Sequence, residues 1–159
     1  MKVITGLLAL VIAGAFSLSA EAFCFKEAGA RYQIDPRLLM AIAQQESGMN
    51  PTVVNTNRNK SGKAVSYDYG VMQVNSNHVA KLMGMGIIKS KDDLLNNPCL
   101  NVQIGAWILA THLQKCGVNW SCLGSYNAGF SENDVQETKR LNYARKIYRR
   151  YNVQLAGHP

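Results

Sequence analysis

A carboxylate at the end of an apolar helical face is the first feature of the sequence that could do chemistry. Glu46 follows Leu39, Ile42 and Ala43 at the spacing of one helix face, so it continues a hydrophobic stripe. A carboxyl group among apolar side chains has its charged form disfavoured, so its pKa rises and it can act as a general acid near neutral pH. The alternative is that Glu46 lies in the last helical turn with its carboxylate in solvent, and the helix pattern alone favours this alternative.

Several other kinds of catalysis have no matching pattern in the sequence. His78, His112 and His158 form neither an H-E-x-x-H pair nor a close cluster, and no glycine-rich phosphate loop is present. Ser47 is not inside the G-x-S-x-G elbow of serine hydrolases, so we expect it to cap or support its neighbour rather than to act as a nucleophile. We therefore expect neither a metal-dependent nor a serine hydrolase.

The first 22 residues have the composition of a secretory signal peptide. Lys2 supplies a short positive region, residues 4–16 are apolar and uncharged, and residues 20–22 are Ala-Glu-Ala, a small-x-small cleavage signature. The apolar run is too short for a membrane anchor and ends at the cleavage signature. We expect an exported mature chain of residues 23–159, with no membrane insertion after cleavage.

The four cysteines agree with export. Cys24, Cys99, Cys116 and Cys122 are even in number and all follow the predicted cleavage site, as expected for disulfides in an oxidising compartment. The short separation of Cys116 from Cys122 across Gly117 favours that pair, which leaves Cys24 with Cys99. A zinc site would need close cysteine pairs or histidines at ligand spacing, and the sequence has neither.

The net charge of +7 limits the partners of the chain. Basic proteins suit polyanions, which include nucleic acid, anionic membrane surfaces and bacterial cell wall. The export signal argues against nucleic acid and favours the other two. For most individual Lys and Arg residues, the alternative is that the charge only keeps the surface soluble.

Helical signals cover most of the mature chain. Asp35 is a suitable N-cap, Pro36 occupies the first helical position and Gly48 is a C-terminal stop. By capping and periodicity together, we expect helices at 26–32, 36–47, from about 76, 98–115, 120–128 and 135–151. Residues 50–66 lose this periodicity and residues 65–74 have a β-like composition, which predicts a long loop or small hairpin.

The expected fold is therefore mainly α, an α+β arrangement in which a single helical domain carries a small loop or β-hairpin lobe. The lobe follows the second helix, so a cleft can form between it and the helices. Long sugar chains bind in clefts of this kind. Core candidates in the long helix are Leu100, Ile104, Trp107, Ile108 and Leu113.

Four short motifs, taken in order, resemble those of one enzyme family. They are Glu46-Ser47, Gly70-Val71-Met72-Gln73 followed by Val74-Asn75, Ser125-Tyr126-Asn127-Ala128-Gly129, and Tyr143 within Leu141-Asn142-Tyr143-Ala144. Together they resemble lytic transglycosylases with the lysozyme-like soluble-transglycosylase fold, particularly the small exported kind that accompany secretion, pilus and conjugation machines. The likeness covers nearly the whole mature chain. Val71 and Ser125 depart from the usual Leu and Ala, and both departures conserve size.

The resemblance implies nonhydrolytic cleavage of the β-1,4 bond between N-acetylmuramic acid and N-acetylglucosamine in peptidoglycan. Glu46 would act first as acid on the glycosidic oxygen and then, as carboxylate, as base on the muramic acid C6 hydroxyl, which gives a 1,6-anhydro product. No metal or organic cofactor is implied. The implied location is the periplasm of a Gram-negative bacterium, with peptidoglycan strands as substrate and parts of a secretion, pilus or conjugation machine as partners.

A second resemblance concerns Asp68. Residues 66–76 resemble the segment of c-type lysozymes that carries their second catalytic carboxylate, and Asp68 matches that carboxylate. Asp68 would then stabilise positive charge in the transition state or serve a hydrolase. The alternative for Asp68 is a turn or hairpin aspartate that accepts backbone hydrogen bonds. Two other functions also stay open, a true lysozyme and a non-catalytic wall-binding scaffold.

The remaining polar residues of these motifs are candidate substrate-binding or positioning groups: Ser47, Met72, Gln73, Asn75, Tyr126, Asn127 and Tyr143. Gln73 and Asn75 alternate on a segment expected to be extended, so we expect both to point the same way. Tyr143 could hydrogen-bond Glu46 and hold its rotamer. The alternatives are an edge-strand face for the two amides and core packing with a solvated hydroxyl for the tyrosines.

Overall fold

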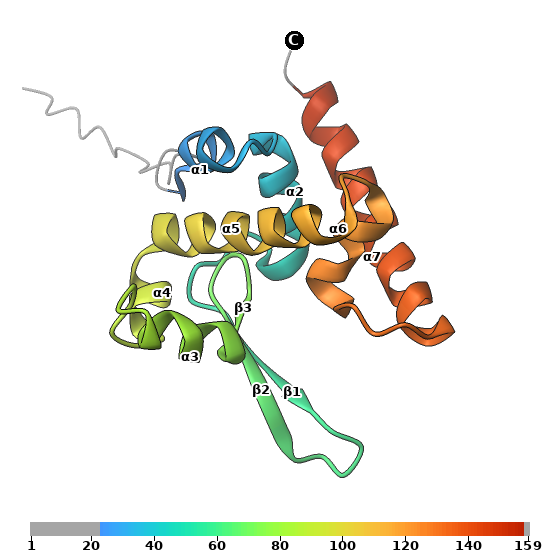
Figure 1. Cartoon of the computed structure of the whole chain (residues 1–159). Coiled ribbons are helices and arrows are strands. Elements are labelled where there is room, and N and C mark those ends of the chain that lie inside the picture. The colour runs from blue at the N-terminus through green and yellow to red at the C-terminus, as the bar shows by residue number, and fades with distance from the viewer. Residues whose placement is uncertain (1–22, 158–159) are drawn as a thin grey trace, which may run out of the picture.

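The structure is a computed structural model that describes residues 23–157, so the predicted signal peptide at 1–22 lies outside the described residues. Helix α5 (Pro98–Cys116) runs through the middle of the molecule (Figure 1). Its buried residues form a broad face, because helices cover it on one flank and the sheet region covers it on the other. Asn97 caps its start by accepting the backbone N–H of Leu100 at 3.0 Å, and Gly117 follows its end.

Helices α1 (Phe25–Tyr32) and α2 (Pro36–Ser47) lie on one side of α5 (Figure 1). Asp35 caps α2 by accepting the Arg37 N–H at 2.8 Å, and Gly48 ends the helix with φ of 61°. This φ favours glycine. The predicted bounds of α2 are confirmed, and they place Glu46 in its last turn.

The polar lobe after α2 is a hairpin with a short third strand. Strands β1 (Val54–Arg58), β2 (Ala64–Tyr69) and β3 (Val74–Asn75) form an antiparallel sheet in that order. The β1–β2 hairpin projects from the body of the molecule (Figure 1). The register places Asn55 opposite Asp68, and Asp68 opposite Asn75, so these three side chains share one face of the sheet.

The remaining helices complete the walls around α5. Helices α3 (Ser76–Gly84) and α4 (Asp92–Asn96) lie beside the sheet, while α6 (Trp120–Ala128) and α7 (Asp134–Ala156) pack against each other. None of the helices within residues 23–157 combines the length and the apolarity that crossing a bilayer requires.

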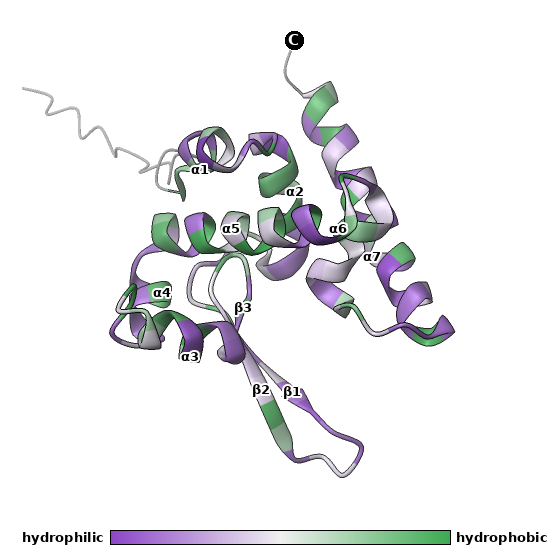
Figure 2. Ribbon diagram, viewed as in Figure 1, coloured by the Kyte–Doolittle hydropathy of each residue, from purple (hydrophilic) through white to green (hydrophobic). Residues whose placement is uncertain are grey.

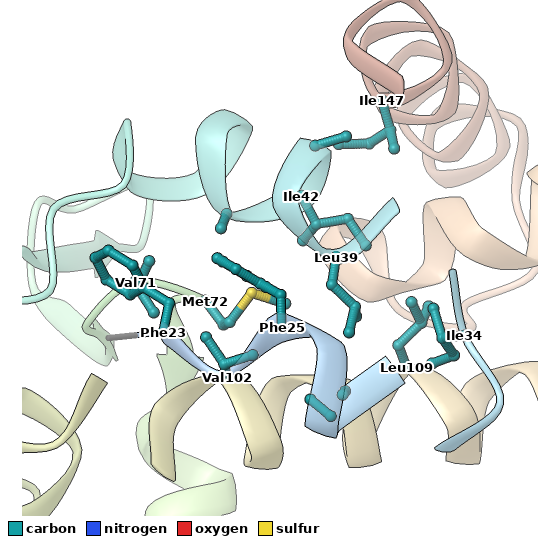
Figure 3. Packing of buried hydrophobic residues seen from close by; sticks show 14 of the residues in the cluster. Phe23, Phe25, Ile34, Leu39, Ile42, Val71, Met72, Val102, Leu109 and Ile147 are labelled. Atoms are coloured by element: carbon teal, nitrogen blue, oxygen red, sulfur yellow. The ribbon is translucent and has the colours of Figure 1, made fainter. Parts of the chain in front are cut away.

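The buried apolar residues form two clusters, one on each side of α5. Figure 3 shows the larger one, which brings together side chains from the chain start, α2, the 70–73 turn, α5 and α7. Figure 2 shows the opposite trend in the hairpin and in α7, where hydrophilic positions dominate. The core candidates Ile104 and Ile108 are buried as predicted, whereas Leu100, Trp107 and Leu113 are only partly buried.

Both predicted disulfides are present, Cys24–Cys99 with a Cα–Cα distance of 5.2 Å and Cys116–Cys122 with 5.6 Å. The first joins the residue before α1 to the beginning of α5, and the second closes the turn between α5 and α6. All cysteines within the described part of the chain are therefore paired.

Three expectations about the elements need correction. Residues 65–74 do not form one extended segment, because Gly70 and Gln73 have φ of 74° and 52° and make a turn between β2 and β3. The short helix α4 was not predicted, since five residues carry little periodicity. Helix α7 continues to Ala156, five residues beyond the predicted end at Tyr151.

Candidate active site

Two carboxylates, Glu46 and Asp68, line one cleft between the helical body and the sheet. The cleft has a volume of about 440 Å³. The predicted residues Gln73, Asn75, Tyr126 and Asn127 also line it, so α2, the sheet and α6 all contribute to its walls. The cleft between two lobes that the sequence predicts is confirmed.

Glu46 is the buried carboxyl group of this cleft. Ile42 and Ala43, on the same helix face, are fully buried, so the neighbours of the carboxyl group exclude water. Burial is the main cause that raises the pKa of Glu46 to about 7, and the negative charge of Asp68 raises it further. The carboxylate does not extend into bulk solvent, which removes the alternative interpretation of its position.

Tyr143 and Tyr126 support this region with their hydroxyls. Tyr143, on α7, donates a hydrogen bond to Oε1 of Glu46, which stabilises the carboxylate and opposes the effect of burial. Tyr126, on α6, donates to the carbonyl of Met72 at 2.8 Å. Burial raises the pKa of both tyrosines well above the usual range, so both remain donors at neutral pH.

The 70–73 turn forms the floor of the site and is held by a buried asparagine. Oδ1 of Asn101 accepts the backbone N–H of Met72 at 2.8 Å, and its Nδ2 donates to the carbonyl of Tyr69 at 2.9 Å. A side chain at Gly70 would place its Cβ 2.2 Å from Nδ2 of Asn101, so both the φ and the close packing require glycine here.

Asp68 is held on the opposite wall by two asparagines. Nδ2 of Asn57 donates to Oδ2 at 2.7 Å, and Nδ2 of Asn75 donates to Oδ1 at 2.7 Å. These side chains come from β1, β2 and the end of β3, and the strand register brings them together. Asp68 does lie in the hairpin, as the alternative interpretation allows, but its hydrogen-bond partners are side chains and not backbone groups.

Gln73 and Asn75 line the cleft, but not as alternating positions of one strand. Gln73 lies in the turn, and its amide joins three segments by accepting from Asn55 at 2.7 Å and donating to the carbonyls of Gly70 and Val53. Asn75 is the N-cap of α3, where its Oδ1 accepts the N–H of Asn77 at 3.1 Å. Both amides therefore hold the cleft wall together.

Met72 does not lie where the prediction placed it, whereas Ser47 supports its surroundings, as expected, and does not line the cleft. The side chain of Met72 is fully buried against Gly105, so only its backbone reaches the site. The hydroxyl of Ser47 donates to the carbonyl of Val71 at 2.8 Å, which ties the end of α2 to the turn. Neither side chain lines the cleft, and both act on the position of their neighbours.

Several cleft or support residues were not among the residues predicted for the site, including Asn57, Asn77, His78, Asn101, His112 and Phe130. Asn101 and His112 do lie on faces of a predicted helix that is otherwise apolar, which was the available signal. Asn57 and Phe130 lie in segments without periodicity, so only the tertiary structure brings them to the site. Among residues 23–157, no group of three or more His, Cys, Asp or Glu side chains is placed to hold a metal ion.

Comparison with known proteins shows which family this chain belongs to. The family model described as "Transglycosylase SLT domain" matches residues 23–150. The chain is 48% identical over 129 residues to a "Peptidoglycan-binding-like protein" of Escherichia coli O157:H7, covering 81% of this chain and 76% of that protein. It is 44% identical to "Protein IpgF" of Shigella flexneri, covering 82% and 80% of the two chains. It is 41% identical to "Invasion protein IagB" of Salmonella typhimurium, covering 84% and 78%.

The fold has a solved counterpart. The X-ray structure of an inactive mutant of the lytic transglycosylase Slt from Pseudomonas aeruginosa matches with a TM-score of 0.59 and 17% identity. The match covers 87% of this chain but only 24% of that larger protein, so it supports the lysozyme-like fold alone. Together with the family match over nearly all described residues, these findings show that the chain belongs to the transglycosylase SLT domain family and is a lytic transglycosylase.

Proposed function

We propose that this protein cleaves the β-1,4 bond between N-acetylmuramic acid and N-acetylglucosamine in peptidoglycan and leaves 1,6-anhydro-muramic acid ends. The observation that carries the proposal is the state of Glu46. Its carboxyl group is buried in the cleft wall with a pKa of about 7, so protonated and ionised forms are both populated near neutral pH. A single group with this pKa suits a reaction that needs an acid first and a base afterwards.

In the first step, protonated Glu46 gives its proton to the glycosidic oxygen as the bond from that oxygen to the muramic acid anomeric carbon breaks. The sugar gains positive charge at the anomeric carbon, and the ionised carboxylate of Asp68 on the facing wall stabilises this charge. Each oxygen of Asp68 already accepts an asparagine N–H at 2.7 Å, which holds the carboxylate in place and favours this electrostatic role over covalent attack.

In the second step, the Glu46 carboxylate takes the proton of the muramic acid C6 hydroxyl, and the C6 oxygen bonds to the anomeric carbon. Glu46 returns to its starting form and no water is consumed. The hydrogen bond from Tyr143 supports the carboxylate that exists between the two steps. Tyr126 and Asn127 are proposed to position the sugar, because both line the same cleft.

The second candidate is a hydrolase that uses Asp68 and water to give reducing ends. Asp68 lies in the same cleft as Glu46, and retaining glycosidases use a pair of carboxylates. This observation supports the hydrolase as the second candidate. A non-catalytic scaffold is less well supported, since the buried carboxyl group would then have no use for its raised pKa.

For the biological setting, we propose that the exported protein opens the wall locally in the periplasm for a secretion, pilus or conjugation apparatus. Two observations support this setting. The relative IagB is named an invasion protein, and both disulfides suit an oxidising compartment.

Mass spectrometry of fragments released from purified sacculi tests the proposed reaction. We expect anhydro-ended muropeptides, which are lighter by one water than hydrolysed ones. Reducing ends would establish the hydrolase instead, and no release by the folded protein would support the scaffold. A Glu46→Gln variant processed in parallel identifies the part of the signal that depends on this carboxyl group.

A further inference from the structure

A serine and a histidine that the proposed reaction does not use meet on the wall of the cleft formed by α5 and α6. Nδ1 of His112 lies 2.8 Å from Oγ of Ser125, and Oγ of Ser125 lies 2.6 Å from the carbonyl oxygen of Cys122. Ser125 is almost completely buried, with 1% of its surface exposed, and both side chains line the cleft.

These two distances decide which ring nitrogen carries the proton. Two oxygens at 2.6 Å need a hydrogen between them, and the carbonyl of Cys122 has none to give. The Ser125 hydroxyl therefore donates to that carbonyl, and its single proton is not available to His112. Nδ1 of His112 must then be the donor to Ser125, which leaves Nε2 as an acceptor. Burial lowers the pKa of His112, and the nearby His78 and Lys115 lower it further, so the neutral form of the ring is favoured at pH 7.

The surroundings of His112 restrict what this acceptor could bind. Phe130 lies against the ring with a centroid distance of 4.7 Å, and Ile108 lies one turn earlier on α5, so the imidazole is flanked by apolar surface within the cleft. The cleft also contains two carboxyl groups. Both oxygens of Asp68 already take asparagine N–H groups, and Oε1 of Glu46 takes the hydroxyl of Tyr143. Among the described residues, the side-chain hydrogen bond of the His112 ring is the one from Nδ1 to Ser125, and none is found at Nε2.

A group with one N–H donor beside a methyl group fits this environment. The hydroxyls of an amino-sugar glycan can donate and accept, so they pair with any side-chain amide, whereas an acetamido N–H can only donate. We propose that Nε2 of His112 accepts the N–H of a substrate N-acetyl group, with its methyl group against Phe130 and Ile108, and that Ser125 acts as a positioning residue by fixing the tautomer. This inference rests on the proposed glycan substrate and adds the part of the sugar that this wall recognises.

The tautomer can be measured without any assay of activity. In ¹⁵N-labelled protein at pH 7, we expect the ring shifts of His112 to show a protonated Nδ1 and an unprotonated Nε2. In Ser125→Ala, the ring loses its acceptor and should change to a mixture of tautomers. A wild-type ring protonated on Nε2, or on both nitrogens, would overturn the proposal.

Binding of an N-acetylglucosamine oligosaccharide tests the ligand. In the Glu46→Gln background, which prevents cleavage, the Nε2 shift of His112 should move on titration. Adding His112→Ala should weaken binding by about three- to tenfold, the size of one neutral hydrogen bond, and adding Ser125→Ala should weaken it by less. Thr111→Ala is the matched control, because the Thr111 hydroxyl donates in the same way to the carbonyl of Trp107 at 2.9 Å but has no histidine partner.

A cello-oligosaccharide, which carries a hydroxyl in place of each acetamido group, separates the acetamido group from the rest of the sugar. Glucosamine would not serve, because its amino group keeps an N–H donor. We expect His112→Ala to weaken binding of this ligand less than binding of the N-acetylglucosamine oligosaccharide, and an equal loss of affinity for both ligands would overturn the proposal. Thermal melts of each variant establish that the binding differences come from folded protein. Because binding is measured without turnover, the two proposals can fail separately. If His112→Ala does not weaken binding as expected, the proposed reaction is unaffected. If the released fragments carry reducing ends instead of anhydro ends, the binding test still decides the role of His112.

Discussion

The two walls of the cleft carry the same functional group in opposite environments. Glu46 comes from the end of an apolar helix and is surrounded by buried side chains, so burial raises its pKa to about 7. Asp68 comes from a strand in a polar sheet face and accepts two side-chain N–H groups. The comparison teaches that the local fold sets the environment of each carboxyl group, with a raised pKa on the helical wall and a carboxyl group held by two asparagine side chains on the sheet wall.

The largest expected effect is the loss of the acid itself. Glu46→Gln keeps the shape and the hydrogen bond from Tyr143 but removes the titrating proton, so we expect release of muropeptides to fall by about a thousandfold or more. The exposed carboxylate of Glu27 provides the control, and Glu27→Gln should release fragments at the wild-type rate. If Glu46→Gln retained the wild-type rate, the helical wall would not hold the catalytic acid.

The same variant should change how stability depends on pH. The folded-state pKa of Glu46, about 7, is above the unfolded value of 4.5, so the folded protein keeps a proton that the unfolded chain has lost. This contribution to the free energy of unfolding is fully present below pH 4.5 and is lost as pH rises through 7. Denaturant unfolding of wild type and Glu46→Gln should diverge across this window by up to about 3 kcal/mol.

A pH-independent difference between the two proteins would mean that the Glu46 carboxyl group titrates as it does in water. Because other groups titrate equally in both proteins, the comparison uses the difference between them and not the stability of either one.

Removing the charge on the sheet wall should have a smaller effect. Asp68→Asn removes the electrostatic support of the transition state, and we expect a loss in kcat of about ten- to a hundredfold. Because the charge of Asp68 raises the pKa of Glu46, the alkaline limb of the kcat/KM profile should also move to lower pH. Asp134→Asn, at an exposed position at the start of α7, should change neither.

If the alkaline limb of the kcat/KM profile of Asp68→Asn stayed at the wild-type pH, the carboxyl groups of Glu46 and Asp68 would not be electrostatically coupled. Full loss of cleavage in a folded protein, together with reducing ends from the wild type, would instead favour the hydrolase.

The smallest expected effect concerns the hydrogen bond on the helical wall. Tyr143→Phe removes the donor that stabilises the Glu46 carboxylate, so the pKa of Glu46 should rise and the alkaline limb should move to higher pH. We expect a loss in kcat of only about three- to tenfold, as for one hydrogen bond. Tyr148→Phe, at a half-exposed position on the same helix, is the matched control, and a limb that moved to lower pH would contradict the assigned role of Tyr143.

Much of this fold could be predicted where the pattern is local. The caps at Asp35 and Gly48 led to the bounds of α2, because capping depends on residues near in sequence. The short separation of Cys116 from Cys122 led to that disulfide, and Cys24–Cys99 followed as the remaining pair. The turn between β2 and β3 was missed, because its backbone is stabilised by Asn101, which lies about thirty residues later on α5. No local pattern reports such a contact.

The structure brings several of the residues predicted for the site into one cleft, but not all of them. Tyr143 was expected to reach Glu46 and does so across 97 residues of chain, whereas Met72 turned inward and contributes only its backbone. Ser125 stands where the motif of the family usually has Ala, and because the two residues are similar in size, the sequence gave no local signal that Ser125 has a role. Its hydroxyl nevertheless holds the ring of His112, a residue on another helix.

The sequence by itself determined the elements, the disulfide pairing and the position of Glu46 at the end of an apolar face, because periodicity, caps and spacing act over a few residues. Only the tertiary structure decided which side chains surround that carboxyl group, how Asp68 is held opposite it, and where the proton of His112 lies. The physical reason is that pKa and hydrogen bonding depend on burial and on partners brought together from distant segments. Those properties exist only after the chain has packed.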